Sequence, residues 1–421
     1  MSADLPVAGK ALAAAGADVR EGTAADAIGD VTPAFVASPA STEQAAAVML
    51  AAAEHDLAVV PRGGGSRLGW GVPSSRCDLM ADMTRMNAVT EHASGDLVAR
   101  VQAGARMGDI ASVLAAAGQQ IALDVPAGAT AGGVVASGLA GPRRLRYGAP
   151  RDLLIGITVV RADGTVARSG GKVVKNVAGY DLGKLFAGSA GTLGLITEVT
   201  FRLHPLPAAI AFLTAEYAAV PAACEAVAAA ANSPLTASAV ELSRPSPGGP
   251  LRVAVLLEGS ADGVAARARR MADLMGSAEV SQSAPAWWPG PVTSPASGGT
   301  LVRVSFWVSA LGQVLDVLDA AAREAGISPQ VAGSAGAGVL DASCPPGEPD
   351  ACARFVAALR GTLDHGHPAV AVLTAPAQVR AALAGHGGMA GRVPALSLMR
   401  SVKNQFDPGH RMSPGRFPEV I

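Results

Sequence analysis

The first 207 residues alternate short apolar runs with polar and glycine-rich stretches, a pattern typical of short strands and helices. Ser41-Thr-Glu-Gln44 has the residue types of a helix N-cap and predicts a helix that runs to about His55. The apolar run at 57–60 predicts a strand that leads directly into a glycine loop at 61–69. Further runs predict a helix at 107–116 and strands at 78–83, 88–91, 97–103, 153–161, 166–169 and 195–203.

From about residue 208 the pattern changes to alanine-rich helical segments that alternate with longer apolar strands. This order predicts an α+β domain in which helices cover one face of an antiparallel sheet. The predicted helices lie at 219–231, 263–275, 311–325 and 351–363, and the predicted strands at 209–215, 251–258, 301–308 and 369–373.

Changes in composition divide the chain into four regions. Residues 1–32 are rich in alanine and glycine and are expected to form a flexible lead-in with at most one short helix. A first domain is expected at 33–207 and an α+β cap domain at 208–395. The final segment, 396–421, is expected to be helical to about Phe406 and then to end in two Pro-Gly turns.

Charge and cysteine spacing argue against several functional classes. The 33 Lys and Arg residues balance 34 Asp and Glu residues, and the net charge of −1 argues against a nucleic-acid-binding protein. A local basic patch is nevertheless present at Arg143, Arg144 and Arg146. The four cysteines form no CxxC pair, which argues against a disulfide framework, a zinc ribbon or an iron–sulfur site built by this chain alone.

Nothing in the sequence indicates a membrane span or a secretory leader. The longest apolar runs, such as 45–53, are alanine-rich and too short to cross a bilayer. The first residues show no basic stretch followed by an apolar core, so no signal peptide is expected. The expected compartment is the cytoplasm.

The first glycine loop has the composition of an anion cradle. It matches neither the Walker A string nor GxGxxG, because Leu68 stands where the third glycine would be. Gly63, Gly64 and Gly65 would still let backbone N–H groups converge on a phosphate, with Ser66 adding a hydroxyl donor. A plain β-turn is the structural alternative.

Two further stretches have the same character. Residues 126–138 are small and uncharged and include the hydroxyl groups of Thr130 and Ser137, although a tight helix–helix contact would also need small residues. Residues 188–194 form the third glycine-rich loop. A dinucleotide of the length of FAD needs several backbone contact points, so three such loops in one domain favour a cofactor site.

At this point the residues show a resemblance to a known superfamily. The strings 61–66, 130–133, 146–152 and 191–196 occur in the order seen in flavoproteins of the vanillyl-alcohol oxidase/PCMH type. The match covers about 33–207 of this chain. Within that superfamily, the strings 137–148 and 170–182 look like the FAD-binding (E) subunit of bacterial glycolate oxidase.

The resemblance implies a PCMH-type FAD-binding domain of two subdomains, with the C-terminal segment returning to it. It also implies noncovalent FAD, because covalent relatives carry a histidine where this chain has Ser66. Ser413 replaces the asparagine usual in the family ending, which weakens any role for that side chain. The residues expected along the cofactor are Pro61, Arg62, Gly63, Gly64, Gly65, Ser66, Gly69, Pro126, Thr130, Gly132, Gly133, Ser137, Gly138, Tyr147, Gly148, Gly194 and Ile196.

The resemblance also implies an activity and partners. The E subunit is thought to work beside a second flavoprotein subunit and an iron–sulfur subunit, which together oxidise glycolate to glyoxylate. Attachment to the inner face of the membrane through such a complex follows from the resemblance alone. Two alternatives stay open: a flavin-bearing structural subunit without its own chemistry, and a stand-alone oxidoreductase of D-2-hydroxy acids or alcohols.

Candidate catalytic residues are few. Hydride transfer from a 2-hydroxy acid needs a base for the hydroxyl proton and a cation for the carboxylate. Arg303, within an apolar strand, is the candidate clamp, and a paired strand-edge arginine is the alternative. Lys175 and Tyr180 could face the flavin or belong to a structural turn. No metal site is expected, because the His-rich motif of single-chain relatives is absent.

Overall fold

The fold of the chain was analysed in a computed structural model, which describes residues 5–172, 180–276, 278–288, 298–363 and 369–416. The chain divides into two compact units. Unit 1 consists of Met1–Leu139, Ala149–Leu206 and Pro394–Ile421, and unit 2 consists of Ala140–Gly148 and Pro207–Val393. The short segment Ala140–Gly148 therefore belongs with the cap residues, although it interrupts the sequence of the first domain.

The first sheet of unit 1 has the strand order β1-β2-β4-β3. Its central strands β2 (Phe35–Ser38), β4 (Leu79–Asp82) and β3 (Val59–Arg62) are parallel, which requires crossovers such as α2 (Thr42–Glu54). The predicted N-cap of α2 is confirmed, because the Ser41 side chain accepts a hydrogen bond from the Gln44 N–H.

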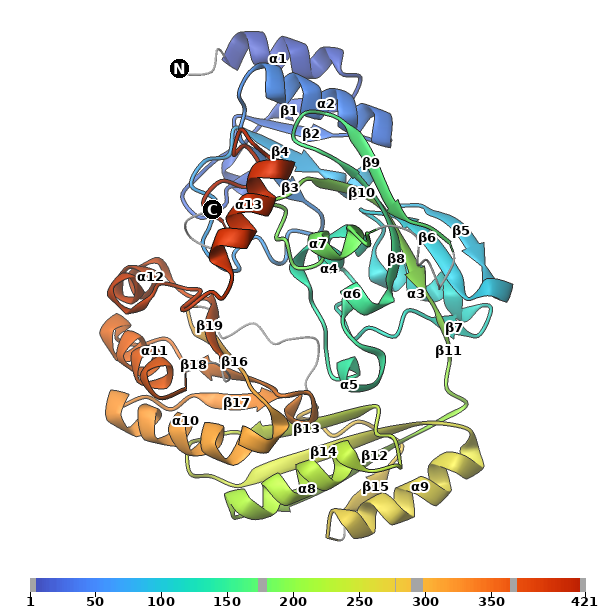
Figure 1. The fold of residues 1–421 in the computed structure, drawn as a ribbon, viewed down its shortest axis with the longest axis vertical. Helices are drawn as coiled ribbons and strands as arrows, with labels where there is room; N and C mark the ends of the chain where they lie inside the picture. Colours follow the sequence, from blue (N-terminus) through green and yellow to red (C-terminus); the bar gives the residue numbers. More distant parts are fainter. Residues whose placement is uncertain (1–4, 173–179, 277, 289–297, 364–368, 417–421) are drawn as a thin grey trace. The chain divides into compact units, whose positions relative to one another are not determined.

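The expectation of a flexible lead-in at 1–32 is wrong for the described part of that region. Residues Leu5–Ala14 form helix α1, and Asp18–Glu21 form strand β1, antiparallel to β2. Figure 1 shows α1 beside α2 next to this sheet. The side chains of Ala8 and Leu12 are fully buried in the core shared with α2, so packing stabilises a segment that composition alone describes as loose.

The second sheet of unit 1 is antiparallel, with the strand order β5-β6-β10-β8-β9. Helices α3 (Met107–Ala115), α4 (Ala131–Ser137) and α6 (Pro150–Leu153) contribute to its core. The strands are β5 (Val89–Ala93), β6 (Val98–Gln102), β8 (Leu154–Val160), β9 (Val166–Gly170) and β10 (Leu195–Arg202). A two-residue ladder joins β7 (Gln119–Gln120) to β11 (His204–Pro205), and the short α7 (Gly183–Phe186) precedes the third glycine loop.

The C-terminal residues add to the first sheet of unit 1. Helix α13 (Leu396–Phe406) is followed by a tail that runs parallel to β3. The Val59 N–H donates to the Arg411 carbonyl at 2.8 Å, and the Ser413 N–H donates to the Val59 carbonyl at 2.9 Å. The last described residues are thereby hydrogen-bonded to the strand that leads into the first glycine loop.

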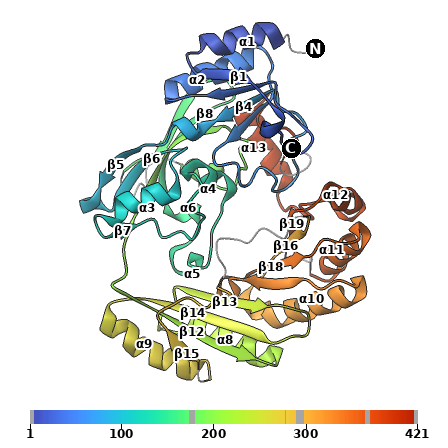
Figure 2. The same ribbon diagram turned by 180° about the vertical axis from the view of Figure 1, so that it is seen from behind.

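Unit 2 contains an eight-stranded sheet with the order β15-β12-β14-β13-β17-β18-β16-β19, in which every ladder is antiparallel. Helices cover one face of it, and the short α5 (Arg144–Tyr147) lies on the other face (Figures 1 and 2). The strands are β12 (Ala209–Tyr217), β13 (Ala239–Arg244), β14 (Leu251–Gly259), β15 (Glu279–Ser281), β16 (Thr300–Ser305), β17 (Gln330–Gly333), β18 (Val339–Cys344) and β19 (Ala369–Thr374). The helices are α8 (Val220–Asn232), α9 (Ala261–Leu274), α10 (Leu311–Ala325), α11 (Pro349–Leu363) and α12 (Ala377–Leu383).

Among the described residues, no helix is both long enough and apolar enough to cross a membrane.

Candidate cofactor site

The first glycine loop of unit 1 lies directly against the loop that precedes α4. A Cβ atom added at Gly63 would lie 2.1 Å from the Thr130 Oγ1 atom, and one at Gly64 would lie 2.8 Å from the Gly128 carbonyl oxygen. Both distances are shorter than real Cβ contacts, so only glycine fits at these two positions. The backbone conformation of Gly65, with φ of +74°, also favours glycine. The structure thus brings together two of the three predicted loops.

Thr130 carries a polar atom that the described part of the protein leaves without a partner. Its side chain is buried, yet its hydroxyl group makes no hydrogen bond to any described residue. A Cβ atom at Gly133 would lie 2.9 Å from this hydroxyl oxygen, so Gly133 keeps the space beside it open. A buried hydroxyl group without a hydrogen-bond partner costs free energy of folding. We therefore expect the Thr130 hydroxyl to bond to a ligand.

Gly132 has a different local role. Its N–H already donates to the Ala103 carbonyl at 2.8 Å. A Cβ atom there would lie 2.7 Å from the Ala103 Cβ atom, so this glycine permits close packing of α4 on the end of β6. Ser137 and Gly138 close the same helix: the Ser137 hydroxyl donates to the Val134 carbonyl, and Gly138 is a left-handed C-cap.

The third loop joins the other two. The N–H groups of Gly188 and Ala190 donate to carbonyl groups of α4, at 2.9 and 2.7 Å. A Cβ atom at Gly191 would lie 3.3 Å from the Pro61 ring, which places this loop against the start of the first. The Ser189 hydroxyl is a second buried hydroxyl without a partner among the described residues. Gly194 and Ile196 are buried in the β10 region, where Gly194 packs on the Val160 carbonyl.

A buried ion pair in the C-terminal segment holds the third loop. The Lys403 Nζ atom donates to the Asp407 carboxylate at 2.6 Å, to the Thr192 carbonyl at 2.7 Å and to the Met412 carbonyl at 2.9 Å. Both charged side chains are almost completely buried. The pKa of Lys403 is lowered, because the effect of burial exceeds the opposing effect of the Asp407 carboxylate. Sequence reasoning missed this pair, whose one sequence signal is the i, i+4 spacing of Lys and Asp near the end of a helix.

Arg416 holds the first loop through hydrogen bonds to backbone carbonyl groups. Its guanidinium donates to the Leu68 and Arg67 carbonyl groups, both at 2.7 Å. Burial lowers the pKa of Arg416 to about 10. The Ser413 hydroxyl, at the position where the family usually has asparagine, donates to the Gly191 carbonyl at 3.2 Å. The tail therefore bonds to the first loop and to the third.

Arg62, a predicted cofactor residue, has its guanidinium bound to carboxylates. It donates to Asp26 at 2.9 Å and to Asp82 at 2.7 Å. Asp26, which is buried, also receives a bidentate pair of bonds from Arg20. The Arg20 bonds, and then those of Arg62 and Thr23, hold the pKa of Asp26 well below its usual range. The Arg62 side chain thus anchors the end of β3, from which the glycine loop starts.

Asp26→Asn is expected to lower the free energy of unfolding by about 2 kcal/mol at neutral pH, since charge-assisted hydrogen bonds are lost. The folded-state pKa of Asp26 is lowered, so its stabilising effect is present above the unfolded value near 4 and is lost as pH falls. The difference between variant and wild type in urea unfolding should therefore shrink from pH 7 to pH 3. Asp18→Asn, which removes an exposed carboxylate, is the control and should change little. Equal stability of Asp26→Asn and wild type at pH 7 would contradict this role.

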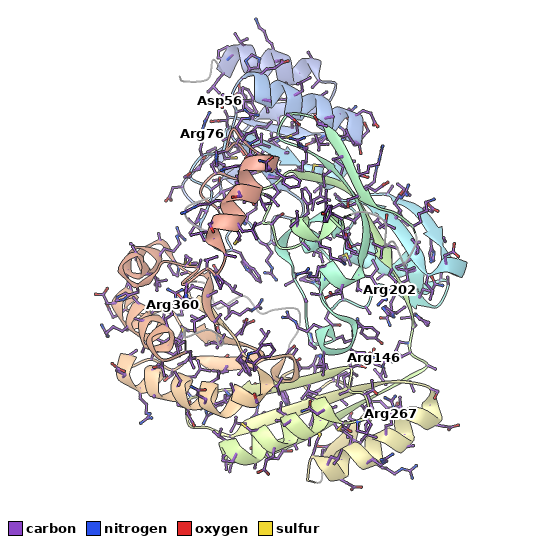
Figure 3. The ribbon with its side chains drawn as sticks, viewed as in Figure 1. Asp56, Arg76, Arg146, Arg202, Arg267 and Arg360 are labelled. Carbon is purple, nitrogen blue, oxygen red and sulfur yellow. The ribbon has the colours of Figure 1, made fainter. Side chains whose placement is uncertain are left out.

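The other predicted cofactor residues lie in varied settings. Ser66 and Gly69 are exposed in the first loop, and the Pro126 carbonyl accepts the Ala129 N–H in a turn. Tyr147 and Gly148 belong to unit 2, where the guanidinium of Arg146 (labelled in Figure 3) lies 5.2 Å from the Tyr147 ring centroid. Burial, and then the charge of Glu258, raise the pKa of Tyr147. Contacts of these residues with the cofactor stay predictions.

Of the three candidate catalytic residues, the structure describes Arg303 in unit 2 and Tyr180 in unit 1. The Arg303 guanidinium makes a bidentate ion pair with Asp341 at 2.8 Å, across neighbouring strands β16 and β18. It is therefore paired, as the structural alternative stated, although β16 is an inner strand and not an edge. Tyr180 is 92% exposed. Lys175 lies outside the described residues.

The geometry of unit 1 fits a dinucleotide with a diphosphate. The glycines at which a Cβ atom would clash allow the backbones of the loops to approach one another closely. The hydroxyl groups of Thr130 and Ser189 are buried and have no hydrogen-bond partner among the described residues. Residues 33–170 match the sequence profile of the FAD binding domain. This part of the chain is an FAD-binding domain. The predicted cofactor, FAD, is thereby confirmed.

A solved structure confirms the predicted fold of the FAD-binding domain and cap. The structure of p-cresol methylhydroxylase with substrate bound matches 92% of this chain and 89% of that chain, with a TM-score of 0.70 and 17% sequence identity. At this sequence identity the match is evidence for the fold alone. It supports the PCMH-type α+β architecture with antiparallel sheets.

Curated relatives connect the chain to two enzyme groups. Glycolate oxidase subunit GlcD of Bacillus subtilis is 35% identical over 206 residues, which are 47% of this chain and 44% of that protein. D-lactate dehydrogenase of Anaerostipes hadrus is 33% identical over 190 residues, 45% of this chain and 40% of that protein. Glycolate oxidase subunit GlcE of Escherichia coli is 43% identical over 117 residues, 27% of this chain and 33% of that protein. The matched segments span less than half of the length of these relatives.

Proposed function

We propose that this chain is the FAD-binding subunit of a glycolate oxidase-like complex. In this role it oxidises a 2-hydroxy acid, glycolate to glyoxylate, by hydride transfer to the flavin, and electrons pass to a partner iron–sulfur subunit. A second flavoprotein subunit is the other proposed partner. The observation that carries the proposal is the FAD-binding domain, together with relatives of the chain that include two glycolate oxidase subunits and a D-lactate dehydrogenase.

In this proposal the three loops of unit 1 bind the diphosphate of noncovalent FAD. The backbone N–H groups of 63–66 and the Thr130 hydroxyl supply the hydrogen-bond donors. The side chains of Arg62, Lys403 and Arg416 hold the loops in place through bonds to residues other than the cofactor. FAD, when bound, supplies the hydride acceptor. Arg303 is the proposed cation for the substrate carboxylate, and Lys175 and Tyr180 remain proposed candidates for positions beside the flavin.

A flavin-bearing structural subunit is the second candidate function. It is favoured by the pairing of Arg303 with Asp341 within unit 2 and by the exposure of Tyr180 in unit 1. In that case another chain would perform the oxidation. A stand-alone oxidoreductase of D-2-hydroxy acids or alcohols would instead form hydrogen peroxide without partners.

The purified chain is expected to be yellow, and anaerobic glycolate or D-lactate should bleach the visible absorption band of its flavin. Acid precipitation should leave the flavin in the supernatant, because Ser66 offers no histidine nitrogen for a covalent bond. A band that persists with every 2-hydroxy acid, in the chain alone and in the copurified complex, would overturn the proposed oxidation. Bleaching in the complex alone would assign the chemistry to the assembled subunits.

A further inference from the structure

Arg416, the last residue of the tail that the structure describes, is a buried cation. It is only 6% exposed. The backbone before it is held in place, because the Pro414 carbonyl accepts the Ser75 N–H at 3.0 Å and the Ser74 hydroxyl at 3.0 Å. The Arg416 N–H in turn donates to the Ser413 carbonyl at 3.2 Å. The guanidinium therefore has a fixed position beside the first glycine loop.

Arg416 differs from the two other cations that hold the loops. Arg62 and Lys403 each form ion pairs with carboxylates. Within the described ranges, the guanidinium of Arg416 bonds to the carbonyl groups of Arg67 and Leu68 and to no carboxylate. Burial lowers the pKa of Arg416 to about 10, and no carboxylate in the described part of the chain opposes this effect. A buried charge without a counter-charge is costly, so we expect an anion that none of these residues supplies.

The bonds of Arg416 connect its charge to the donors of the first loop. The two carbonyl groups that accept these bonds belong to the peptide groups whose N–H ends are those of Leu68 and Gly69. The Leu68 N–H closes a turn of the loop by donating to the Gly65 carbonyl at 3.2 Å, and Gly69 is exposed. A cation at the carbonyl end of a peptide group polarises the group and makes its N–H end more positive. The charge of Arg416 therefore increases the attraction of this loop for an anion.

We propose that Arg416 is a positioning residue for the diphosphate of FAD and acts through the Arg67 and Leu68 peptide groups. The loop lies within the FAD-binding domain, whose cofactor carries a diphosphate. When FAD is bound, the negative charge of the diphosphate balances the buried guanidinium. A neutral donor in place of Arg416 would hold the two carbonyl groups and would not attract the anion. The inference concerns the cofactor and does not depend on which substrate the flavin oxidises.

The test compares the dissociation constants of FAD and riboflavin for the apoprotein, because riboflavin has the flavin ring without the diphosphate. Arg416→Gln should weaken FAD binding about 10- to 100-fold and change riboflavin binding little. Arg416→Lys keeps the charge and should weaken FAD binding less than Arg416→Gln does. The matched control is Arg360→Gln, since Arg360 (labelled in Figure 3) is also a buried arginine whose guanidinium donates to backbone carbonyls. The control should bind FAD like wild type.

Three results would overturn the inference. The first is equal FAD affinity in Arg416→Gln and wild type. The second is an equal loss of affinity for FAD and for riboflavin, because the effect would then not involve the diphosphate. The third is an Arg416→Lys variant that binds FAD as weakly as Arg416→Gln, because the hydrogen bonds of the guanidinium and not its charge would then be responsible.

A measurement on the wild-type protein covers the case in which Arg416→Gln does not fold. Because the tail brings Arg416 to the loop, diphosphate binding and tail docking must stabilise each other. ADP, which carries a diphosphate without the flavin, should therefore slow the modification of Arg416 by phenylglyoxal in the apoprotein, and adenosine should not. Peptide mass spectrometry measures the labelling, and the labelling of Arg360 should respond to neither nucleotide nor nucleoside. Labelling of Arg416 that ADP leaves unaltered would contradict the proposed coupling.

Discussion

Gly63→Ala is expected to weaken FAD binding by about 100-fold while leaving the chain folded. The new methyl group would lie 2.1 Å from the Thr130 Oγ1 atom and 3.2 Å from the Thr130 Cβ atom. Relief of this overlap requires the two loops to separate, and their separation moves both the backbone donors and the unpartnered hydroxyl away from the diphosphate. The measurement is the dissociation constant of FAD for the apoprotein, together with the flavin content after gel filtration.

Gly95→Ala is the matched control for this variant. Gly95 lies in an exposed turn of the same unit, and a Cβ atom there would meet nothing within 4 Å. The control should retain FAD like wild type, and both variants should unfold at similar urea concentrations. Full flavin content in Gly63→Ala would show that this contact does not shape the cofactor site.

Lys403→Met is expected to lower the free energy of unfolding by about 3–5 kcal/mol, because Asp407 is left as a buried charge without its cation. The same change removes the bonds to the Thr192 and Met412 carbonyls, so the third loop and the tail lose their connection. We therefore expect weaker FAD retention as well as a lower urea midpoint. Chemical unfolding at neutral pH measures the first effect, and flavin content measures the second.

Two companion variants test the cause. Lys403→Met combined with Asp407→Asn should recover part of the lost stability, since the pair leaves no uncompensated charge. Lys172→Met removes an exposed lysine that pairs with Glu91, and it should change the urea midpoint little. A single variant Lys403→Met that unfolds like Lys172→Met would refute the importance of the buried pair.

Much of the fold could be predicted because local signals agree with the tertiary structure. The Ser41 N-cap and the apolar runs place α2, β3, β8 and β10 within a few residues of their observed bounds. Strands β13, β17 and β18 were missed, because one of their faces carries charged or small residues such as Glu241 and Asp341. Their strand character depends on ladder partners that are distant in sequence.

The candidate site could be predicted only in part, for a similar reason. Glycine-rich composition locates the three loops, but nothing local shows that Gly63 packs on Thr130, which lies in another loop. Lys403 and Arg416 bond mainly to backbone carbonyls, and no residue type marks a carbonyl partner in advance. The partner of Arg303 could not be named in advance, because Asp341 lies 38 residues away on a strand that the pattern did not predict.

The attachment of the tail to β3 has a consequence for biosynthesis. Arg416 bonds to the carbonyl of Leu68, which precedes it by 348 residues, and the entire cap is encoded between them. A ribosome therefore synthesises the first glycine loop before the cap, and the tail residues that bond to this loop after the cap. In the nascent chain the first glycine loop therefore lacks its hydrogen bonds to the tail until the cap has been translated.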